Sequence, residues 1–116
     1  LCPTGKLIFT TLNGLYPLYH NVRDFIEGNK VGVDTGKLTF DLLTFRESSD
    51  IEFTTDSGEK KRINTNERYY VPPEITWLTK SIGFRKTEIF GAKLGAFSRQ
   101  DKLTPEDYEM LIIALK

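Results

Sequence analysis

Few side chains of this sequence are suited to chemistry, and His20 is its only histidine. Histidine changes its charge near neutral pH, which suits proton removal from a reacting group. A lone histidine beside Tyr19, at the start of a predicted helix, is nevertheless more often a partly exposed packing residue than a base. The one cysteine, Cys2, has no ligand spacing to His20 that matches a known metal site. The sequence therefore predicts no metal site and assigns no catalytic residue.

Two further motifs favour structural roles. Lys60-Lys61-Arg62 is a basic triplet beside a predicted turn, and we interpret it as a solvated strand end. Gly91 to Ala96 carries two glycines after a predicted strand, but no helical pattern follows and no Gly-x-Gly-x-x-Gly occurs. A Gly-x-Ser-x-Gly elbow is also absent from the sequence, which excludes the usual serine-hydrolase arrangement.

Composition indicates one small domain over residues 1–116, because 39% of the residues are hydrophobic. The 16 basic and 16 acidic residues balance, so no nucleic-acid partner is expected. No apolar run approaches the roughly 18 residues of a membrane span, and we expect no membrane partner. A single cysteine forms no internal disulfide, and no secretory signal is visible, which favours a cytoplasmic location.

The first third of the chain predicts a strand, a helix and a loop. Lys6 to Thr11 is an apolar run of β-favouring residues that ends before Asn13-Gly14, as in a buried strand. Tyr16 to Glu27 suits a helix, since its apolar residues fall near one face and Gly28 supplies a stop. The polar stretch from Asn29 to Gly36 is typical of a loop.

The middle of the chain predicts three antiparallel strands. Apolar and polar residues alternate over Lys37 to Arg46, which indicates a strand with one covered face, although Phe45 falls out of phase. The segments Ile51 to Thr55 and Glu59 to Asn66 follow, joined by Asp56-Ser57-Gly58. Glycine in that turn permits the positive φ of a hairpin loop.

A helix is predicted over Val71 to Ser81, with prolines at its start and an acidic residue in its first turn. We expect Ile75, Leu78 and Ile82 to form its buried stripe. Gly83 is placed to end the helix in the left-handed conformation, with the next residue, a phenylalanine, folding back on the last turn.

A strand over Thr87 to Phe90 follows, and the tail contains a conflict. Thr104-Pro105-Glu106-Asp107 has the form of a helix start, with a capping threonine and an acid three residues later. Tyr108 to Leu115 is nevertheless too uniformly apolar for a surface helix and fits a buried strand. We predict the strand, preceded by a single helical turn.

The order of these elements resembles the C-terminal half of class I S-adenosylmethionine-dependent methyltransferases, over nearly the whole chain. Leu1-Cys2-Pro3-Thr4-Gly5 is similar to the Leu-Lys-Pro-Gly-Gly loop before the fifth strand of that family, with departures at Cys2 and Thr4. A β-rich stretch over 37–68, Arg68-Tyr69-Tyr70-Val71-Pro72-Pro73-Glu74-Ile75, the helix end at Ser81-Ile82-Gly83-Phe84 and a strand at Glu88-Ile89-Phe90 follow in family order. The implied fold class is α+β, or partial α/β: the C-terminal part of a Rossmann-like sheet plus a three-stranded antiparallel insertion over 37–68.

The resemblance also implies site residues. Thr11 and Leu12, at the end of the fifth strand, correspond to cofactor-binding positions, and the implied cofactor is S-adenosyl-L-methionine. Asn13, Arg68 and Tyr70 correspond to substrate-binding positions at the rim of the acceptor cleft. Simpler alternatives stay open: Asn13 belongs to a turn with Gly14, Tyr69 packs in the core, and Arg68 pairs with a surface carboxylate.

Two functions from different classes follow. The first is the acceptor-side portion of a methyltransferase that acts on a small molecule or an unknown acceptor and is not competent alone, because the family's glycine-rich cofactor loop is missing from this sequence. The second is a non-enzymatic module that forms homodimers through an exposed strand edge at Leu7 to Thr11. In the first case the missing N-terminal half would cover that edge. Whether the chain is an enzyme stays open at this point.

Overall fold

A computed structural model describes residues 2–28, 37–93 and 95–116. The chain divides into two compact units, a first unit of Leu1–Tyr19 with Tyr70–Lys116 and a second unit of His20–Tyr69. The single domain over 1–116 stays a prediction, and the predicted loop over 29–36 lies outside the described residues.

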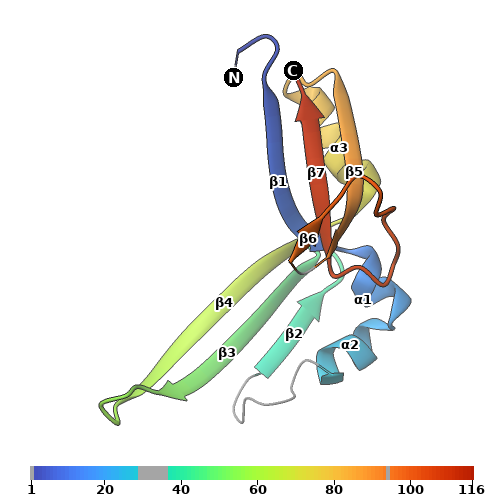
Figure 1. Cartoon of the computed structure of the whole chain (residues 1–116). Helices are drawn as coiled ribbons and strands as arrows, with labels where there is room; N and C mark the ends of the chain where they lie inside the picture. Colours follow the sequence, from blue (N-terminus) through green and yellow to red (C-terminus); the bar gives the residue numbers. More distant parts are fainter. Residues whose placement is uncertain (1, 29–36, 94) are drawn as a thin grey trace. The chain divides into compact units, whose positions relative to one another are not determined.

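The first unit is built on a sheet whose middle strand is β7 (Glu109–Leu115). β1 (Lys6–Asn13) pairs with one side of β7, and β5 (Lys86–Lys93) pairs with the other side, both antiparallel. The short β6 (Ala96–Phe97) pairs with the end of β5. Figure 1 shows β1, β7 and β5 side by side. The strands predicted at 6–11, 87–90 and 108–115 are thus confirmed, each somewhat different in length.

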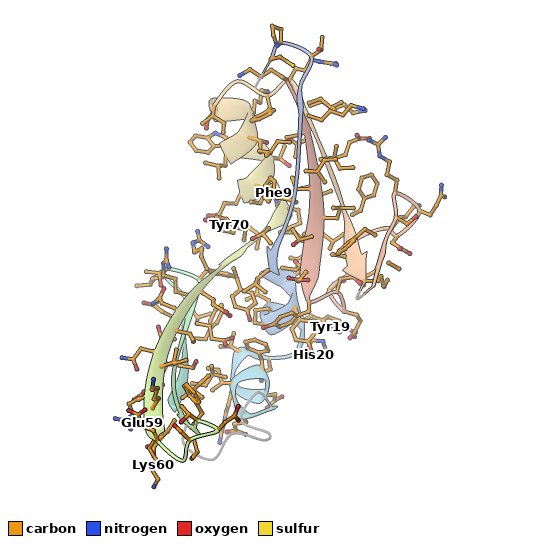
Figure 2. All side chains as sticks on the ribbon, turned by 60° about the vertical axis from the view of Figure 1, so that its left-hand side comes forward. Phe9, Tyr19, His20, Glu59, Lys60 and Tyr70 are labelled. Atoms are coloured by element: carbon orange, nitrogen blue, oxygen red, sulfur yellow. The ribbon has the colours of Figure 1, made fainter. Side chains whose placement is uncertain are left out.

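The core of the first unit lies on one face of this sheet. Alternation along β7 places the fully buried Met110 and Ile112 on that face, where they pack with Ile75 of the neighbouring helix. Partly buried hydrophobic side chains pack around this cluster: Phe9, Tyr70, Ile89 and Leu103. Phe9 and Tyr70 are labelled in Figure 2. The register of the strands brings these side chains together, because Phe9, Ile112 and Ile89 lie across from one another on adjacent strands.

The helix α3 (Pro72–Ser81) packs against β5 and is confirmed. It ends as predicted: Gly83 has φ 103°, and the N–H groups of Gly83 and Phe84 donate to the carbonyls of Lys80 and Thr79. The predicted buried stripe is wrong in part, since Leu78 is 41% and Ile82 60% exposed. Ile75 and Thr79, one turn apart, face the sheet instead.

A single turn precedes β7. The N–H of Asp107 donates to the carbonyl of Thr104, which closes one turn, and the chain then continues as a strand. The conflict in the tail is therefore resolved as predicted.

The helix predicted over Tyr16 to Glu27 is wrong as one element. Two short helices replace it, α1 (Leu15–Tyr19) in the first unit and α2 (Val22–Gly28) in the second. Asn21 lies between them with φ 57°, which no α-helix allows, and its side-chain oxygen accepts a hydrogen bond from the Arg23 N–H. Asparagine is one of the residues that tolerates this conformation and caps helices, so the break has a local cause.

The second unit is built on an antiparallel sheet of β2 (Lys37–Asp41), β3 (Arg46–Thr54) and β4 (Lys60–Tyr70), whose last residue belongs to the first unit. The three antiparallel strands are confirmed, but the strand predicted over 37–46 is wrong in its second half, since β2 ends at Asp41. The predicted range contains a turn at 42–45, where Asp41 Oδ1 accepts hydrogen bonds from the N–H groups of Leu43 and Thr44. The predicted turn at Gly58 is confirmed, with φ 84°.

Aromatic rings form the core of the second unit. Phe40 lies edge-to-face against Phe45 and Tyr69, with ring centroids 5.5 Å apart in each pair. Phe25 of α2 packs against Phe40 and Tyr69 at 6.3 and 5.8 Å. These are favourable aromatic geometries, and they fix α2 on one face of the sheet.

Candidate functional site

The strand ends of the first unit define its candidate site. β1 and β5 are both antiparallel to β7, so they run parallel to each other and end at the same edge, at Asn13 and Lys93. Ligands of doubly wound sheets bind beyond the carboxyl ends of the strands. The side chains gathered at this edge are therefore the first candidates for a functional role.

Asp107 is the buried charge at this edge, with 4% exposure. Its Oδ1 accepts a hydrogen bond of 2.8 Å from Lys93 Nζ, and its Oδ2 accepts bonds from the N–H and the hydroxyl of Thr104, at 2.8 and 3.2 Å. Burial acts to raise the pKa of Asp107, but the hydrogen bonds from Lys93 and Thr104 and the Lys93 charge outweigh it and lower that pKa. Asp107 is held as a carboxylate.

Lys93 is the exposed partner of this pair, with about half of its side chain accessible to solvent. The hydrogen bond and the negative charge of Asp107 raise the pKa of Lys93 above its ordinary value. Gly91, two residues earlier in β5, makes the pairing sterically feasible, because a Cβ there would lie 2.4 Å from Asp107 Oδ2. The close approach requires glycine at this position.

Asn13 is fully buried at the same edge, and its hydrogen bonds go to the main chain. Its Nδ2 donates to the carbonyls of Asp107 and Thr104, at 2.8 and 3.3 Å, and its Oδ1 accepts from the Leu15 N–H. These bonds tie the end of β1 to the turn before β7. Asn13 has a structural role here, and a contact with substrate stays a prediction.

Thr11 and Leu12 precede Asn13 and are partly buried. Thr11 lies across from Met110 and Leu12 across from Glu109, so the two side chains point to opposite faces of the sheet. Their part in cofactor binding stays a prediction.

Arg68 and Tyr70, the other predicted substrate residues, fall in different units. Tyr70 packs its ring against the core of the first unit, and its carbonyl accepts a hydrogen bond of 2.8 Å from the Gly14 N–H. In the second unit, Arg68 Nη1 donates to the carbonyl of Tyr69. The alternative that Tyr69 packs in the core is confirmed, since its exposure is 0%.

The second unit holds a buried carboxyl group of its own. Tyr69 donates its hydroxyl to Glu47 Oε2 at 2.9 Å, and Glu47 is 9% exposed. Burial raises the pKa of Glu47; the bond from Tyr69 opposes this rise, and the charge of Glu67 across the sheet adds to it. Sequence reasoning missed this pair, because glutamate within a strand is usually exposed.

Sequence reasoning also missed Lys93 and Asp107. One signal was present: an acid three residues after Thr104 is the pattern of a capping box, whose acid bonds back to the first N–H. Asp107 makes that bond to Thr104, although only one turn forms.

The remaining motifs have structural surroundings. Gly91 to Ala96 leads from β5 into β6 with φ 76° at Gly95, and Leu94 lies outside the described residues. The basic triplet is exposed near the hairpin turn, and Figure 2 labels Glu59 and Lys60 there. Across the described residues, no three His, Cys, Asp or Glu side chains gather as a metal site would require, and no helix is long and apolar enough to cross a membrane.

Comparison with solved structures identifies a similar fold. The chain is similar to the CcbJ methyltransferase from Streptomyces caelestis, with a TM-score of 0.60 and 12% sequence identity. The similarity covers 95% of this chain and 45% of that one, so this chain spans less than half of its length. No family model and no curated protein matches the sequence. This fold is part of a methyltransferase fold, as the resemblance implied.

Proposed function

We propose that this chain forms the acceptor-side part of an S-adenosylmethionine-dependent methyltransferase. The main support for this proposal is the fold similarity to a methyltransferase over 95% of the chain. The parallel ends of β1 and β5 support the proposal, because they provide the edge at which this class of sheet binds ligands. Thr11 and Leu12 would lie toward the cofactor, and Asn13, Arg68 and Tyr70 toward the methyl acceptor, a small molecule or an unknown substrate.

The residues present do not make up a complete cofactor site. Sheets of this type hold the cofactor mainly by a glycine-rich loop after the first strand and an acid after the second, and no Gly-x-Gly-x-x-Gly occurs in this sequence. At the strand ends, the Asn13 amide is already bonded to the main chain. We therefore propose that this chain is not competent alone.

The test is S-adenosylmethionine binding, measured by calorimetry on this 116-residue chain and on the complete polypeptide that its gene encodes. We expect no heat of binding from the chain alone and saturable binding, at one site, by the complete polypeptide. Absence of binding by both would overturn the proposal. Saturable binding by the chain alone would overturn the statement that it is incomplete.

A second candidate is a non-enzymatic module that forms homodimers. Its support is the apolar strand β1, which pairs with β7 on one side and in which Ile8 is 61% exposed. An open apolar edge favours pairing with another chain. A dimeric mass in analytical ultracentrifugation, with slow hydrogen exchange at Leu7 to Thr11, would favour it; a monomer with fast exchange there would exclude it.

The partners and the cellular location of the protein are proposals as well. The balanced charge favours a partner other than nucleic acid, and the sequence favours a cytoplasmic location without a membrane partner. Fractionation of cells that express the tagged complete polypeptide tests the location directly.

A further inference from the structure

The end of β1 carries the asparagine of this chain that is chemically the most prone to lose its side-chain amide. Asn13 is the only asparagine in the sequence that a glycine follows. Deamidation begins when the main-chain nitrogen of the following residue attacks the side-chain carbonyl carbon. Gly14 permits this approach best, because glycine has no Cβ to hinder it. The sequence alone therefore makes Asn13 a candidate modification site.

The reaction at this position needs only water as a co-reactant. The Gly14 nitrogen gives up its proton to solvent and forms a bond to Cγ of Asn13. The bond from Cγ to Nδ2 breaks, and Nδ2 takes up a proton and leaves as ammonia. Water then opens the cyclic succinimide at either of its carbonyls. One opening gives aspartate, and the other gives isoaspartate, in which the main chain is one carbon atom longer.

The fold holds the Asn13 side chain away from this reaction. The residue is fully buried, and its Nδ2 donates to the carbonyls of Asp107 and Thr104, at 2.8 and 3.3 Å. Its Oδ1 accepts a hydrogen bond of 3.1 Å from the Leu15 N–H. The leaving nitrogen and the carbonyl group under attack are thus both bonded to the main chain, and the side chain cannot turn toward Gly14 while these bonds persist.

The attacking nitrogen is held as well. The Gly14 N–H donates to the carbonyl of Tyr70 at 2.8 Å. An amide proton that is bonded within the fold reaches solvent only when that bond opens. Reaction at Asn13 therefore requires local opening of the end of β1.

The turn before β7 controls this opening. It provides both acceptors of Asn13 Nδ2, the carbonyls of Thr104 and Asp107. The Asp107 carboxylate stabilises the turn, because it accepts hydrogen bonds from the Thr104 N–H and from Lys93 Nζ, each at 2.8 Å. Loss of either bond should make opening at Asn13 more frequent.

We propose that Asn13 is a latent deamidation site, kept unreactive by the hydrogen bonds at the end of β1 and reactive once that end opens. The product does not fit the native site. A carboxylate accepts hydrogen bonds but donates none, so the carbonyls of Thr104 and Asp107 would lose their donor and face a negative charge. The reaction therefore makes opening irreversible. Nothing in it depends on S-adenosylmethionine, so its failure and the failure of cofactor binding are separate results.

The test measures deamidation of this 116-residue chain in buffer and in urea, at one pH and temperature, by peptide mapping with mass spectrometry. We expect Asn13 to react at least about 100-fold more slowly in the folded chain than in urea. Asn64 and Asn66 are exposed and precede residues with side chains, so they are internal references that should react slowly in both states. Equal rates at Asn13 in both states, or no faster reaction there than at Asn66 in urea, would overturn the proposal.

Variants test the control by the turn. Asp107→Ala should raise the rate at Asn13 in buffer about ten-fold. Lys93→Met removes one bond from a half-exposed side chain and should give an intermediate rate, which keeps the test decisive if Asp107→Ala does not fold. Lys102→Ala, at an exposed residue of the same loop, is the control and should react as the parent chain does. A parental rate at Asn13 in folded Lys93→Met would contradict the role given to the turn.

Asn13→Asp reproduces one product of the reaction. We expect this variant to unfold at a lower urea concentration than the parent, because two carbonyls lose their donor. An unchanged midpoint would show that the product fits the native site, and the statement that opening becomes irreversible would then be wrong.

Discussion

Among the described residues, each unit buries one carboxyl group, and the two carboxyl groups carry opposite pKa shifts. Asp107 of the first unit is 4% exposed and has a lowered pKa, because Lys93 and Thr104 donate to it. Glu47 of the second unit is 9% exposed and has a raised pKa, because burial outweighs the single bond from Tyr69. Similar burial therefore produces opposite charge preferences, according to the donors that surround the carboxyl group.

The difference teaches what each carboxyl group does for its unit. Asp107 is charged and connects β5 to the turn before β7. It therefore stabilises, at neutral pH, the sheet edge at which β1 and β5 end. Glu47 is better accommodated in its neutral form, among aromatic rings and across from Glu67. The first unit gains stability from a buried charge that is paired, and the second loses stability when its carboxyl group ionises.

Replacing Asp107 by alanine is expected to give the largest effect. The change removes three hydrogen bonds and leaves the Thr104 N–H without its acceptor, so we expect the free energy of unfolding to fall by about 3 kcal/mol. Urea denaturation measures it. Lys102→Ala, at an exposed residue of the same loop, is the control and should change stability by less than about 0.5 kcal/mol. Equal effects of the two changes would contradict the role given to Asp107.

Gly91→Ala tests the close approach of β5 to the same carboxylate. A Cβ at Gly91 would lie 2.4 Å from Asp107 Oδ2, and the displacement should lower the free energy of unfolding by about 2 kcal/mol. Gly28→Ala is the matched control, because a Cβ there meets no atom within 4 Å. That control should be neutral or stabilising by up to about 1 kcal/mol. Thermal unfolding of both variants gives the comparison.

Tyr69→Phe removes the hydroxyl that bonds to Glu47. The buried carboxyl group loses its donor, and we expect a loss of about 1.5 kcal/mol at neutral pH together with a further rise in the pKa of Glu47. Urea denaturation measures the first effect, and side-chain carboxyl NMR titration measures the second. Tyr19→Phe, which keeps the Tyr69 hydroxyl in place, should leave the titration of Glu47 unchanged. An unchanged Glu47 titration in Tyr69→Phe would show that the bond does not act on this group.

The smallest expected effect is the change of stability with pH, which should have opposite signs for the two carboxyl groups. A raised pKa of Glu47 means that its contribution is full below the unfolded value, near 4.5, and is lost as pH rises through the folded value. Glu47→Gln should therefore match the parent at low pH and exceed its stability at pH 7 by less than about 1 kcal/mol.

Asp107 has the opposite sign in the same experiment. Its lowered pKa gives stability that is present above the unfolded value of 3.8 and is lost as pH falls through the folded value. In Asp107→Asn, the loss of stability at low pH that Asp107 causes should disappear. The part of the pH dependence that Glu47 causes should stay unchanged. Denaturation midpoints between pH 3 and pH 8 check both signs, and parallel curves for the two variants would refute the assignment.

Periodicity and turn chemistry predicted much of the fold. Gly58 and Gly83 were placed correctly because each position requires a positive φ that glycine readily adopts. The turn at 42–45 was missed because Leu42 continues the apparent alternation of the preceding strand, and Phe45, although out of phase, is also apolar. There the side chain of Asp41 stabilises the turn, a local bond that hydrophobic pattern does not reveal.

The candidate site was less predictable than the fold. Asn13 was identified at the end of its strand, but the carbonyls that accept hydrogen bonds from its Nδ2 lie more than ninety residues away along the chain, at Thr104 and Asp107. The pairing of Lys93 with Asp107 likewise depends on the register of β5 and β7. Such contacts arise from tertiary structure, and a single sequence contains no local signal for them.

The exposure of α3 has an optical consequence. Trp77 is the only tryptophan of the chain, and 72% of its surface is accessible to solvent in the folded state. Its emission spectrum in the native protein should already be close to that of indole in water, so unfolding will shift the spectrum little. A shift to shorter wavelength on addition of another molecule would instead report that this helix has been covered, and the chain therefore contains an intrinsic probe for association at α3.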